Sequence, residues 1–259
     1  MSDNKIKIIN TPLYTIDVIN KLAIIKFKSE APIEDLYELE NSHKYFTKDL
    51  DKISNIDIST RLFIFSKDIF SEEKFSNFFD ELKINPDKKM KFLLGETNVQ
   101  THNLAKFVNI KHRFINDILD SNKLNVIALE GSSIGLWLST ILSGDFAILS
   151  KNSQFTLRFL EDDIFPLGGL MYYLDKYANK STLDDVMLLG EPISAENLSD
   201  WGLVNKVYPT EGFEDKAVEI ALEISKKSEF FIRAYKTSKS QFKGRIVEWL
   251  EKERSFYAK

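Results

Sequence analysis

Apolar and β-branched residues near the start of the chain form two short runs that are typical of β-strands. The runs cover residues 13–18 and 22–27, and Ile19-Asn20-Lys21 between them predicts the turn of a hairpin. Apolar residues at mixed three- and four-residue spacing then predict a helix over 33–50, and an apolar run over 61–66 predicts another strand. Strand, helix and strand in this order predict a parallel α/β arrangement.

The same alternation continues in the second half of the chain, after a charged and weakly periodic stretch over 71–111 that predicts helices joined by loops. The predicted strands cover residues 125–129, 145–149, 155–157 and 203–207. The predicted helices cover residues 107–119, 195–201, 213–227 and 230–257. Ser194 stands where a helix N-cap belongs and Gly202 stands just past a helix end, so the helix between them is bounded on both sides.

Two glycine-rich turns each follow an extended segment and precede the start of a helix. They are Gly131-Ser-Ser-Ile-Gly135 and Pro166-Leu-Gly-Gly169. A turn of this kind presents backbone N–H groups at a helix N-terminus, where they can bind an anion or a developing oxyanion. Glycine turns at such junctions are also common in purely structural roles, so turn chemistry by itself leaves both interpretations open.

The composition excludes several classes of protein. The chain of 259 residues is long enough for one large domain, or for one domain with a small appendage. It has no cysteine, which excludes disulfides, thiolate catalysis and zinc–sulfur sites and favours a reducing cytoplasm. A net charge of −4 without long blocks of one sign predicts no nucleic-acid partner. No stretch approaches the ~18 apolar residues of a membrane span, so we expect a cytoplasmic protein without membrane contact.

One long run of residues resembles the signature of the crotonase (enoyl-CoA hydratase/isomerase) superfamily. The run consists of residues 126–131, 134–135, 145–149, 155, 166–169, 189–196 and 201–207. The resemblance implies an α/β fold, with a crotonase-like spiral of β-β-α units over residues 1–209 and a C-terminal helical trimerisation region over 210–259. It further implies a homotrimer or hexamer, no cofactor, no metal, and an acyl thioester of coenzyme A or of an acyl carrier protein as substrate.

Members of this superfamily hold the thioester oxygen with two backbone N–H groups, so that an enolate can form. The resemblance assigns one donor to Leu136, within Gly135-Leu136-Trp137, whose outer two residues would line the substrate site. It places the other donor near Lys74, in a segment that lacks the small residues of the family pattern. Leucine supplies a backbone N–H as glycine does, so the oxyanion hole can survive.

The two glutamates of a hydratase are absent. The resemblance aligns the first with Ser139, which would contact the substrate, and the second with Phe159. Neither side chain can serve as a general base, so we expect no water addition by the usual route. Glu161 is the candidate acid that could replace them, and its recruitment would leave an ordinary hydratase. The alternative is that Glu161 belongs to a solvated acidic loop with Asp162 and Asp163.

The segment around Phe159 is similar to the decarboxylating members of polyketide β-branching cassettes. Decarboxylation needs an oxyanion hole, an apolar site and a proton donor, and Phe159 would suit the apolar wall. Those relatives use a C-terminal histidine as proton donor, whereas His43, His102 and His112 all lie in the first half of this chain. His112 next to Lys111 is the candidate substitute, and the alternative is a solvated pair on the surface of a helix.

Two functional hypotheses follow. The first is an enzyme that stabilises a thioester enolate in polyketide or fatty-acyl metabolism, as a decarboxylase or a double-bond isomerase. The second is a catalytically inactive homologue with a binding or assembly role. In either case we expect a trimer, because residues 245–257 carry more apolar side chains than a free terminal helix would. These side chains are Ile246, Val247, Trp249, Leu250 and Phe256.

Overall fold

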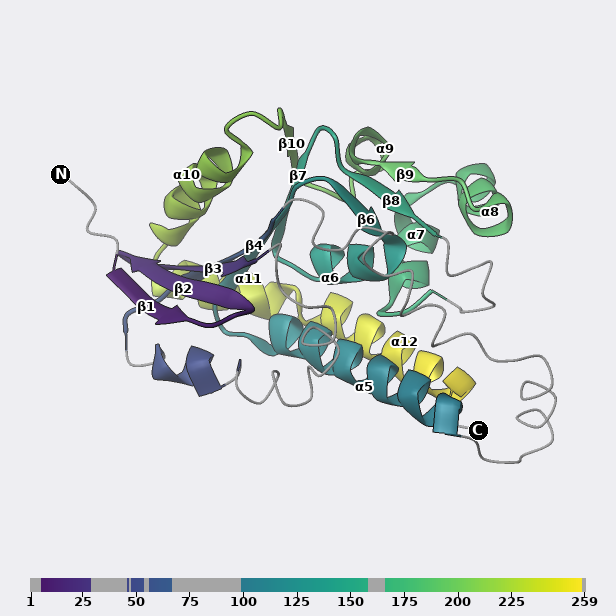
Figure 1. The fold of residues 1–259 in the computed structure, drawn as a ribbon, viewed down its shortest axis with the longest axis horizontal. Coiled ribbons are helices and arrows are strands. Elements are labelled where there is room, and N and C mark those ends of the chain that lie inside the picture. Colours follow the sequence, from purple (N-terminus) through teal and green to yellow (C-terminus); the bar gives the residue numbers. More distant parts are fainter. Residues whose placement is uncertain are drawn as a thin grey trace.

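A mixed seven-stranded sheet with strand order β1-β2-β3-β4-β5-β7-β10 forms the centre of the protein (Figure 1). The computed structural model describes residues 6–28, 46, 48–53, 56–66, 99–157 and 166–257. The strands are β1 (Ile6–Asn10), β2 (Tyr14–Ile19), β3 (Leu22–Phe27), β4 (Thr60–Phe65), β5 (Leu124–Leu129), β7 (Phe146–Ser150) and β10 (Lys206–Tyr208). Strands β1 to β3 pair antiparallel, and every pair from β3 to β10 is parallel. This topology confirms the predicted α/β class.

A smaller sheet and a set of helices complete the described part of the chain. The smaller sheet contains β6 (Ser132–Ile134), β8 (Gln154–Thr156) and β9 (Ile193–Ser194). The helical elements are α5 (Val99–Asp120), η1 (Gly135–Trp137), α6 (Leu138–Leu142), α7 (Leu170–Tyr177), α8 (Lys180–Leu189), α9 (Ala195–Asp200), α10 (Phe213–Ser225), α11 (Glu229–Ser238) and α12 (Ser240–Tyr257). Among these helices, none combines the length and the apolar character needed to cross a membrane.

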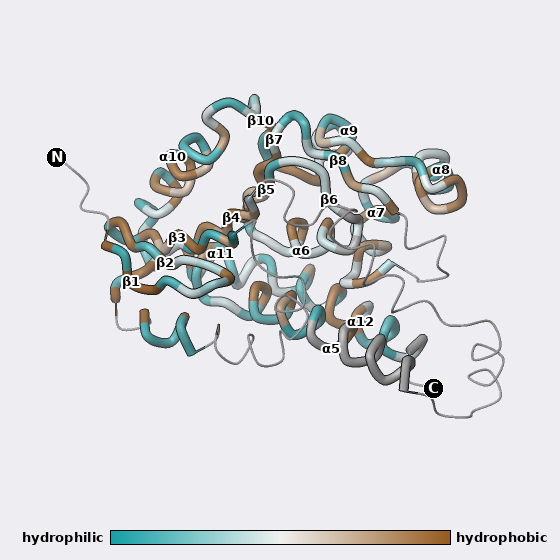
Figure 2. Tube along the Cα trace, in the orientation of Figure 1, coloured by the Kyte–Doolittle hydropathy of each residue, from teal (hydrophilic) through white to brown (hydrophobic). Residues whose placement is uncertain are grey.

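Helices cover both faces of the large sheet, as parallel strands require. Helix α10 packs on one face through Phe213, Ala217 and Ala221. Helices α5 and α6 pack on the other face, and α12 lies along α5 (Figure 1). The tube of Figure 2 is coloured as hydrophobic along the central strands, which are buried on both sides. The two helical layers therefore meet the sheet through separate apolar cores.

Several local predictions are confirmed. The hairpin joins β2 to β3, and Asn20 in its turn adopts a positive φ of 53°, which asparagine tolerates better than most residues. The Ser194 hydroxyl accepts the Asn197 N–H while the Asn197 side chain accepts the Ser194 N–H, so both ends of a capping box are formed. Gly202 follows helix α9 with φ 72°, as a glycine just past a helix end commonly does.

Other elements differ from the pattern-based expectation. Strand β10 begins at Lys206 rather than at residue 203, because the N–H groups of Leu203 and Val204 both bond to the Leu198 carbonyl and close helix α9. The helix predicted over 230–257 is divided into α11 and α12. At the division the Ser238 hydroxyl donates to the Tyr235 carbonyl, which competes with continuation of the helix.

Further differences concern the first half of the chain and the region after α7. Strand β1 and helix α8 were not indicated by the local pattern. Helix α5 begins at Val99, earlier than the predicted 107, and Phe46 with residues 48–52 forms the described part of the helix predicted over 33–50. Residues 33–45, 47 and 71–98 lie outside the described ranges.

A largely buried ion pair joins α11 to the sheet. The Lys236 ammonium lies 2.8 Å from Asp145 Oδ2, and the same oxygen accepts the Asn125 N–H. A Lys236→Met substitution would leave the Asp145 carboxylate without its cation, so we expect a loss of roughly 2–4 kcal/mol in the free energy of unfolding by urea titration. Arg233→Met on the same helix removes an exposed pair with Glu229 and should cost less than about 1 kcal/mol. Equal losses in the two variants would contradict the prediction.

Candidate active site

The residues Gly135, Leu136 and Trp137 form the short 3-10 turn η1, which leads directly from strand β6 into helix α6. The first turn of a helical segment leaves backbone N–H groups without carbonyl partners within that segment. The Leu136 N–H lies in this turn. It therefore occupies the kind of position from which a preorganised backbone donor can bind an oxyanion.

Ser139 lies one turn further along, on α6, and is completely buried. The backbone of Gly168 approaches it so closely that a Cβ atom built on Gly168 would lie 2.4 Å from Ser139 Oγ and 2.6 Å from Ile115 Cδ1. Gly168 also has φ +76°, a conformation that favours glycine. Among the described residues, Ser139 is therefore packed closely against the turn before α7, which helix α5 also contacts through Ile115.

A carboxylate from the C-terminal helix binds the same glycine turn. Glu253 Oε2 accepts the Gly168 N–H at 2.7 Å, and Oε1 accepts the Gly169 N–H at 2.7 Å. Gly169 is the N-cap of α7, so the negative charge lies at the positive end of that helix. This turn does bind an anion, but the anion is a side chain of the protein itself. Its N–H groups are not available for an oxyanion.

His112 contacts the same carboxylate from helix α5. Its Nε2 lies 2.9 Å from Glu253 Oε2, and both side chains have no exposed surface. His112 Nδ1 is also buried and has no hydrogen-bond partner among the residues that the structure describes. The alternative interpretation of Lys111 and His112 as a solvated surface pair is wrong, because Lys111 is 4% and His112 0% exposed.

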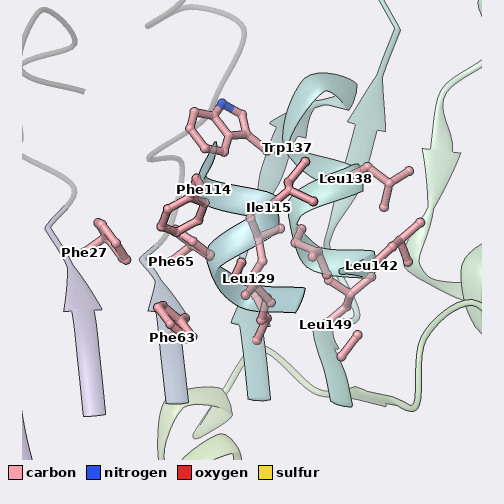
Figure 3. Packing of buried hydrophobic residues seen from close by; sticks show 14 of the residues in the cluster. Phe27, Phe63, Phe65, Phe114, Ile115, Leu129, Trp137, Leu138, Leu142 and Leu149 are labelled. Atoms are coloured by element: carbon pink, nitrogen blue, oxygen red, sulfur yellow. The ribbon is translucent and has the colours of Figure 1, made fainter. Parts of the chain in front are cut away.

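Lys111 connects helix α5 to helix α6. Its ammonium donates to Thr140 Oγ1 at 3.1 Å and lies 4.7 Å from the centroid of the Trp137 ring. Burial lowers the pKa of Lys111 to about 7, and attraction by Glu253 offsets part of that shift. Figure 3 shows Trp137 at one end of an apolar cluster that includes Phe114 and Leu138. The Lys111 ammonium, whose pKa is lowered by burial, thus lies beside the N-terminal end of α6.

The comparison with protein families decides the classification of the chain. The family model described as enoyl-CoA hydratase/isomerase matches residues 96–257, which is more than half of the sequence. The chain belongs to the enoyl-CoA hydratase/isomerase family. All of the interactions described above for α5, α6, the 168–169 turn and α12 lie within the matched residues.

Curated relatives match only a part of this family member. Carnitinyl-CoA dehydratase of Salmonella paratyphi A is 27% identical over 122 residues, which is 47% of this chain and 47% of the relative. The enzyme of the same name from Citrobacter koseri is 26% identical over the same shares. The chain therefore spans about half the length of the curated relatives that it matches.

Solved structures show that the family fold extends over nearly the whole chain. An enoyl-CoA hydratase from Bacillus halodurans superposes with a TM-score of 0.67 at 15% identity, over 93% of this chain and 92% of that one. An enoyl-CoA hydratase/isomerase from Pseudoalteromonas atlantica gives 0.65 at 18% identity, over 95% and 88%. At these identities the likeness shows the fold alone.

The structure brings some of the predicted site residues together. The continuous segment η1 and α6 contains Gly135, Leu136, Trp137 and Ser139. Lys111, which precedes His112 on α5, bonds to Thr140 in that segment. The predicted positions Lys74, Phe159 and Glu161 lie outside the described residues, so their roles stay predictions. Within the described ranges, no group of His, Asp and Glu side chains is arranged to hold a metal ion.

Sequence reasoning missed Glu253 altogether. It lies 141 residues from His112 along the chain, and nothing in the local pattern of the C-terminal helix distinguishes it from the neighbouring Glu251. The only signal in the sequence was indirect, because Gly168 and Gly169 were identified as a turn with available N–H groups. The partner of that turn could be found only in the folded chain.

Proposed function

We propose that the protein binds an acyl thioester of coenzyme A or of an acyl carrier protein and stabilises its enolate with the Leu136 N–H. We further propose that it catalyses decarboxylation or double-bond isomerisation rather than hydration. The observation that carries the proposal is Ser139, which stands where the resemblance requires the first hydratase glutamate and is buried against Gly168. Family membership and the similarity to carnitinyl-CoA dehydratases support a thioester as substrate.

Decarboxylation and double-bond isomerisation can both proceed without the two hydratase glutamates. Loss of carbon dioxide or migration of a double bond requires donors for the enolate oxygen and a group that transfers a proton. Addition of water requires, besides these, acid–base groups placed around a water molecule, and Ser139 cannot serve as one. In this proposal Gly135 and Trp137 flank the thioester, the second N–H donor lies near Lys74, and Phe159 forms the apolar wall.

A panel of thioesters tests the proposal. Purified protein is mixed with crotonyl, glutaconyl and 3-enoyl thioesters of coenzyme A and of an acyl carrier protein. We expect release of carbon dioxide or a shift of the double bond from at least one of them, and hydration of crotonyl-CoA no faster than background. A hydratase that has both glutamates is the matched control. Hydration within about tenfold of that control would show that the protein is an ordinary hydratase with a recruited acid such as Glu161.

A second candidate function is a non-catalytic homologue that binds a thioester or an acyl carrier protein. The observation in its favour is that Glu253 already satisfies the N–H groups of Gly168 and Gly169, inside a fully buried cluster. Calorimetric titration separates the two functions. Binding of a thioester with no turnover of any member of the panel would favour the second.

We also propose assembly into a homotrimer or hexamer, in which two of the side chains first expected at the interface take no part. Ile246 and Leu250 are buried in the core of their own chain and pack beside Gly169, so they are not available for a partner. Phe230 and Phe231 on α11 are instead 82% and 49% exposed, and Leu188 on α8 is exposed as well. Burial of such groups against a second copy is the simplest way to remove them from water.

Light scattering tests the assembly. We expect a trimer or hexamer at micromolar concentration, and a monomer for the double variant Phe230→Asp and Phe231→Asp. Thr237→Asp adds charge to an exposed position of the same helix and should leave the assembly intact. A monomeric parent protein would contradict the proposal, as would an unchanged mass in the double variant.

A further inference from the structure

Glu253 connects three parts of the fold at one buried point. Its two carboxylate oxygens receive the N–H groups of Gly168 and Gly169 from the turn before α7, and Oε2 also contacts His112 Nε2 from α5. The carboxylate itself comes from α12, near the end of the described chain. Charge-assisted hydrogen bonds of this kind hold their partners in a fixed orientation.

The contacts of Glu253 determine which nitrogen of His112 carries hydrogen. An ionised carboxylate has acceptor sites only, so a ring nitrogen that contacts it must be the donor. Nε2 therefore carries a hydrogen and donates to Oε2 at 2.9 Å. In the neutral ring Nδ1 then has the free electron pair, and Nδ1 is the buried atom that lacks a hydrogen-bond partner among the described residues.

We propose that Glu253 is a positioning residue, which holds His112 as the Nε2–H tautomer and makes Nδ1 the proton-transfer atom of the site. The inference rests on the proposed function, because it supplies the acid–base group that a thioester enolate needs. The arrangement uses the general logic by which a carboxylate orients an imidazole base. Here Glu253 comes from α12 and His112 from α5, whereas the resemblance places the first hydratase glutamate on α6, the helix after the Leu136 turn.

The position of the pair agrees with this role. The Gly168 N–H binds Glu253, and a Cβ atom built on Gly168 would lie 2.4 Å from Ser139 Oγ. The pair and the position of the missing glutamate are therefore both next to Gly168. Ile115, one turn after His112 on α5, contacts the same glycine. The glycine turn is thus a shared neighbour of the His112–Glu253 pair and of Ser139.

The proton balance of both candidate reactions closes with this pair. In decarboxylation the carbon–carbon bond to the carboxylate breaks, its electron pair passes to the enolate oxygen, and carbon dioxide leaves. When the enolate collapses, carbon takes one proton from Nδ1 of a protonated His112, which returns to the neutral Nε2–H form and is protonated again from solvent. In isomerisation neutral Nδ1 removes a proton from one carbon and returns it to another.

In the described part of the chain, two charged groups lie at or next to His112, and the experiment must distinguish their effects. Glu253 contacts the ring directly, and Lys111 precedes it on α5 and interacts electrostatically with Glu253. The Lys111 ammonium donates to Thr140 and lies over the Trp137 ring, and it has no contact with the His112 ring among those that the described residues show. His112 is therefore the group that we assign to proton transfer.

Nitrogen-15 NMR of the histidine rings tests the tautomer without any substrate. The chain has three histidines, so the His112→Gln spectrum identifies the signals of His112. In the parent protein we expect His112 to show the Nε2–H pattern, and in Glu253→Gln we expect that pattern to be lost. Asp49→Asn is the matched control, since it changes another buried carboxylate, which bonds to Tyr14 on β2. An Nδ1–H pattern in the parent protein would overturn the inference even if Glu253→Gln did not fold.

Kinetics on the thioester identified by the panel tests the proton transfer. We expect His112→Gln to lower kcat by about 10²–10⁴-fold. For Glu253→Gln we expect kcat to fall by about 10–100-fold with KM nearly unchanged, because the substrate itself does not contact Glu253. Full turnover in a folded His112→Gln variant would overturn the inference while leaving the proposed function in place. If the parent protein turns over no thioester, the proposed function fails and the proton transfer with it, and the NMR result still decides whether Glu253 fixes the tautomer.

Discussion

Replacement of Ser139 by glutamate is expected to destabilise the protein by roughly 3–5 kcal/mol and to leave hydration of crotonyl-CoA at background. Under the proposed function, the substitution introduces the residue type that the resemblance assigns to this position in a hydratase. Ser139 is completely buried, however, and its hydroxyl lies only 2.4 Å from the place that a Cβ on Gly168 would take. A glutamate there would have to displace the 168–169 turn and place a second carboxylate close to Glu253, which the same turn binds.

Urea unfolding and a hydration assay on the Ser139→Glu variant measure the two parts of this prediction. Ser199→Glu introduces the same side chain at an exposed position of helix α9 and should change the free energy of unfolding by less than about 0.5 kcal/mol. A Ser139→Glu variant that is as stable as the parent and hydrates crotonyl-CoA would show that the site has room for the glutamate. The hydratase chemistry would then depend on this one position.

The free energy of unfolding is expected to rise with pH between about 7 and 10.5 because of Lys111, and a Lys111→Met variant is expected to lose that rise. Burial lowers the pKa of the folded-state ammonium from 10.5 to about 7, and the attraction of Glu253 offsets part of the effect. Between these two values the unfolded chain binds more protons than the folded chain, so stability increases with pH. The cost of burying the charged form is fully present below about pH 7. It vanishes above the unfolded pKa, for a total change of roughly 4–5 kcal/mol.

Urea titrations at about pH 6, 7, 8, 9 and 10 on the parent and on Lys111→Met measure this effect. The informative quantity is the difference in unfolding free energy between the two proteins, since all other titrating groups are shared. Below about pH 7 the variant avoids the cost of burying the charged lysine, so its unfolding free energy is highest relative to that of the parent. We expect this difference to shrink steadily as the pH rises above about 7. The bond to Thr140 is lost at every pH and contributes a constant offset. Lys180→Met, at an exposed position, is the control, and a pH-independent difference for Lys111→Met would contradict the prediction.

Local sequence determined the elements that depend on neighbouring residues. Alternating β-branched runs gave the hairpin of β2 and β3, because strand pairing across a two-residue turn is a local event. Ser194 and Gly202 bounded helix α9, because a cap is formed by atoms only a few residues apart. The order of strands and helices likewise predicted a parallel α/β sheet, and the signature residues predicted the family.

The tertiary structure alone decided what the candidate site contains. Lys111 and His112 have no sequence context that marks them as buried, and their environment is created when α12 packs along α5. Glu253 meets His112 across 141 residues, and the glycine turn that binds it lies more than 80 residues away, at a separation that no local spacing rule spans. The partners of Glu253 depend on which face of α12 packs against α5, and that packing is formed only in the folded chain. The resemblance in sequence could therefore predict that the usual glutamates are missing, but only the folded chain shows that Glu253 contacts His112 and the 168–169 turn.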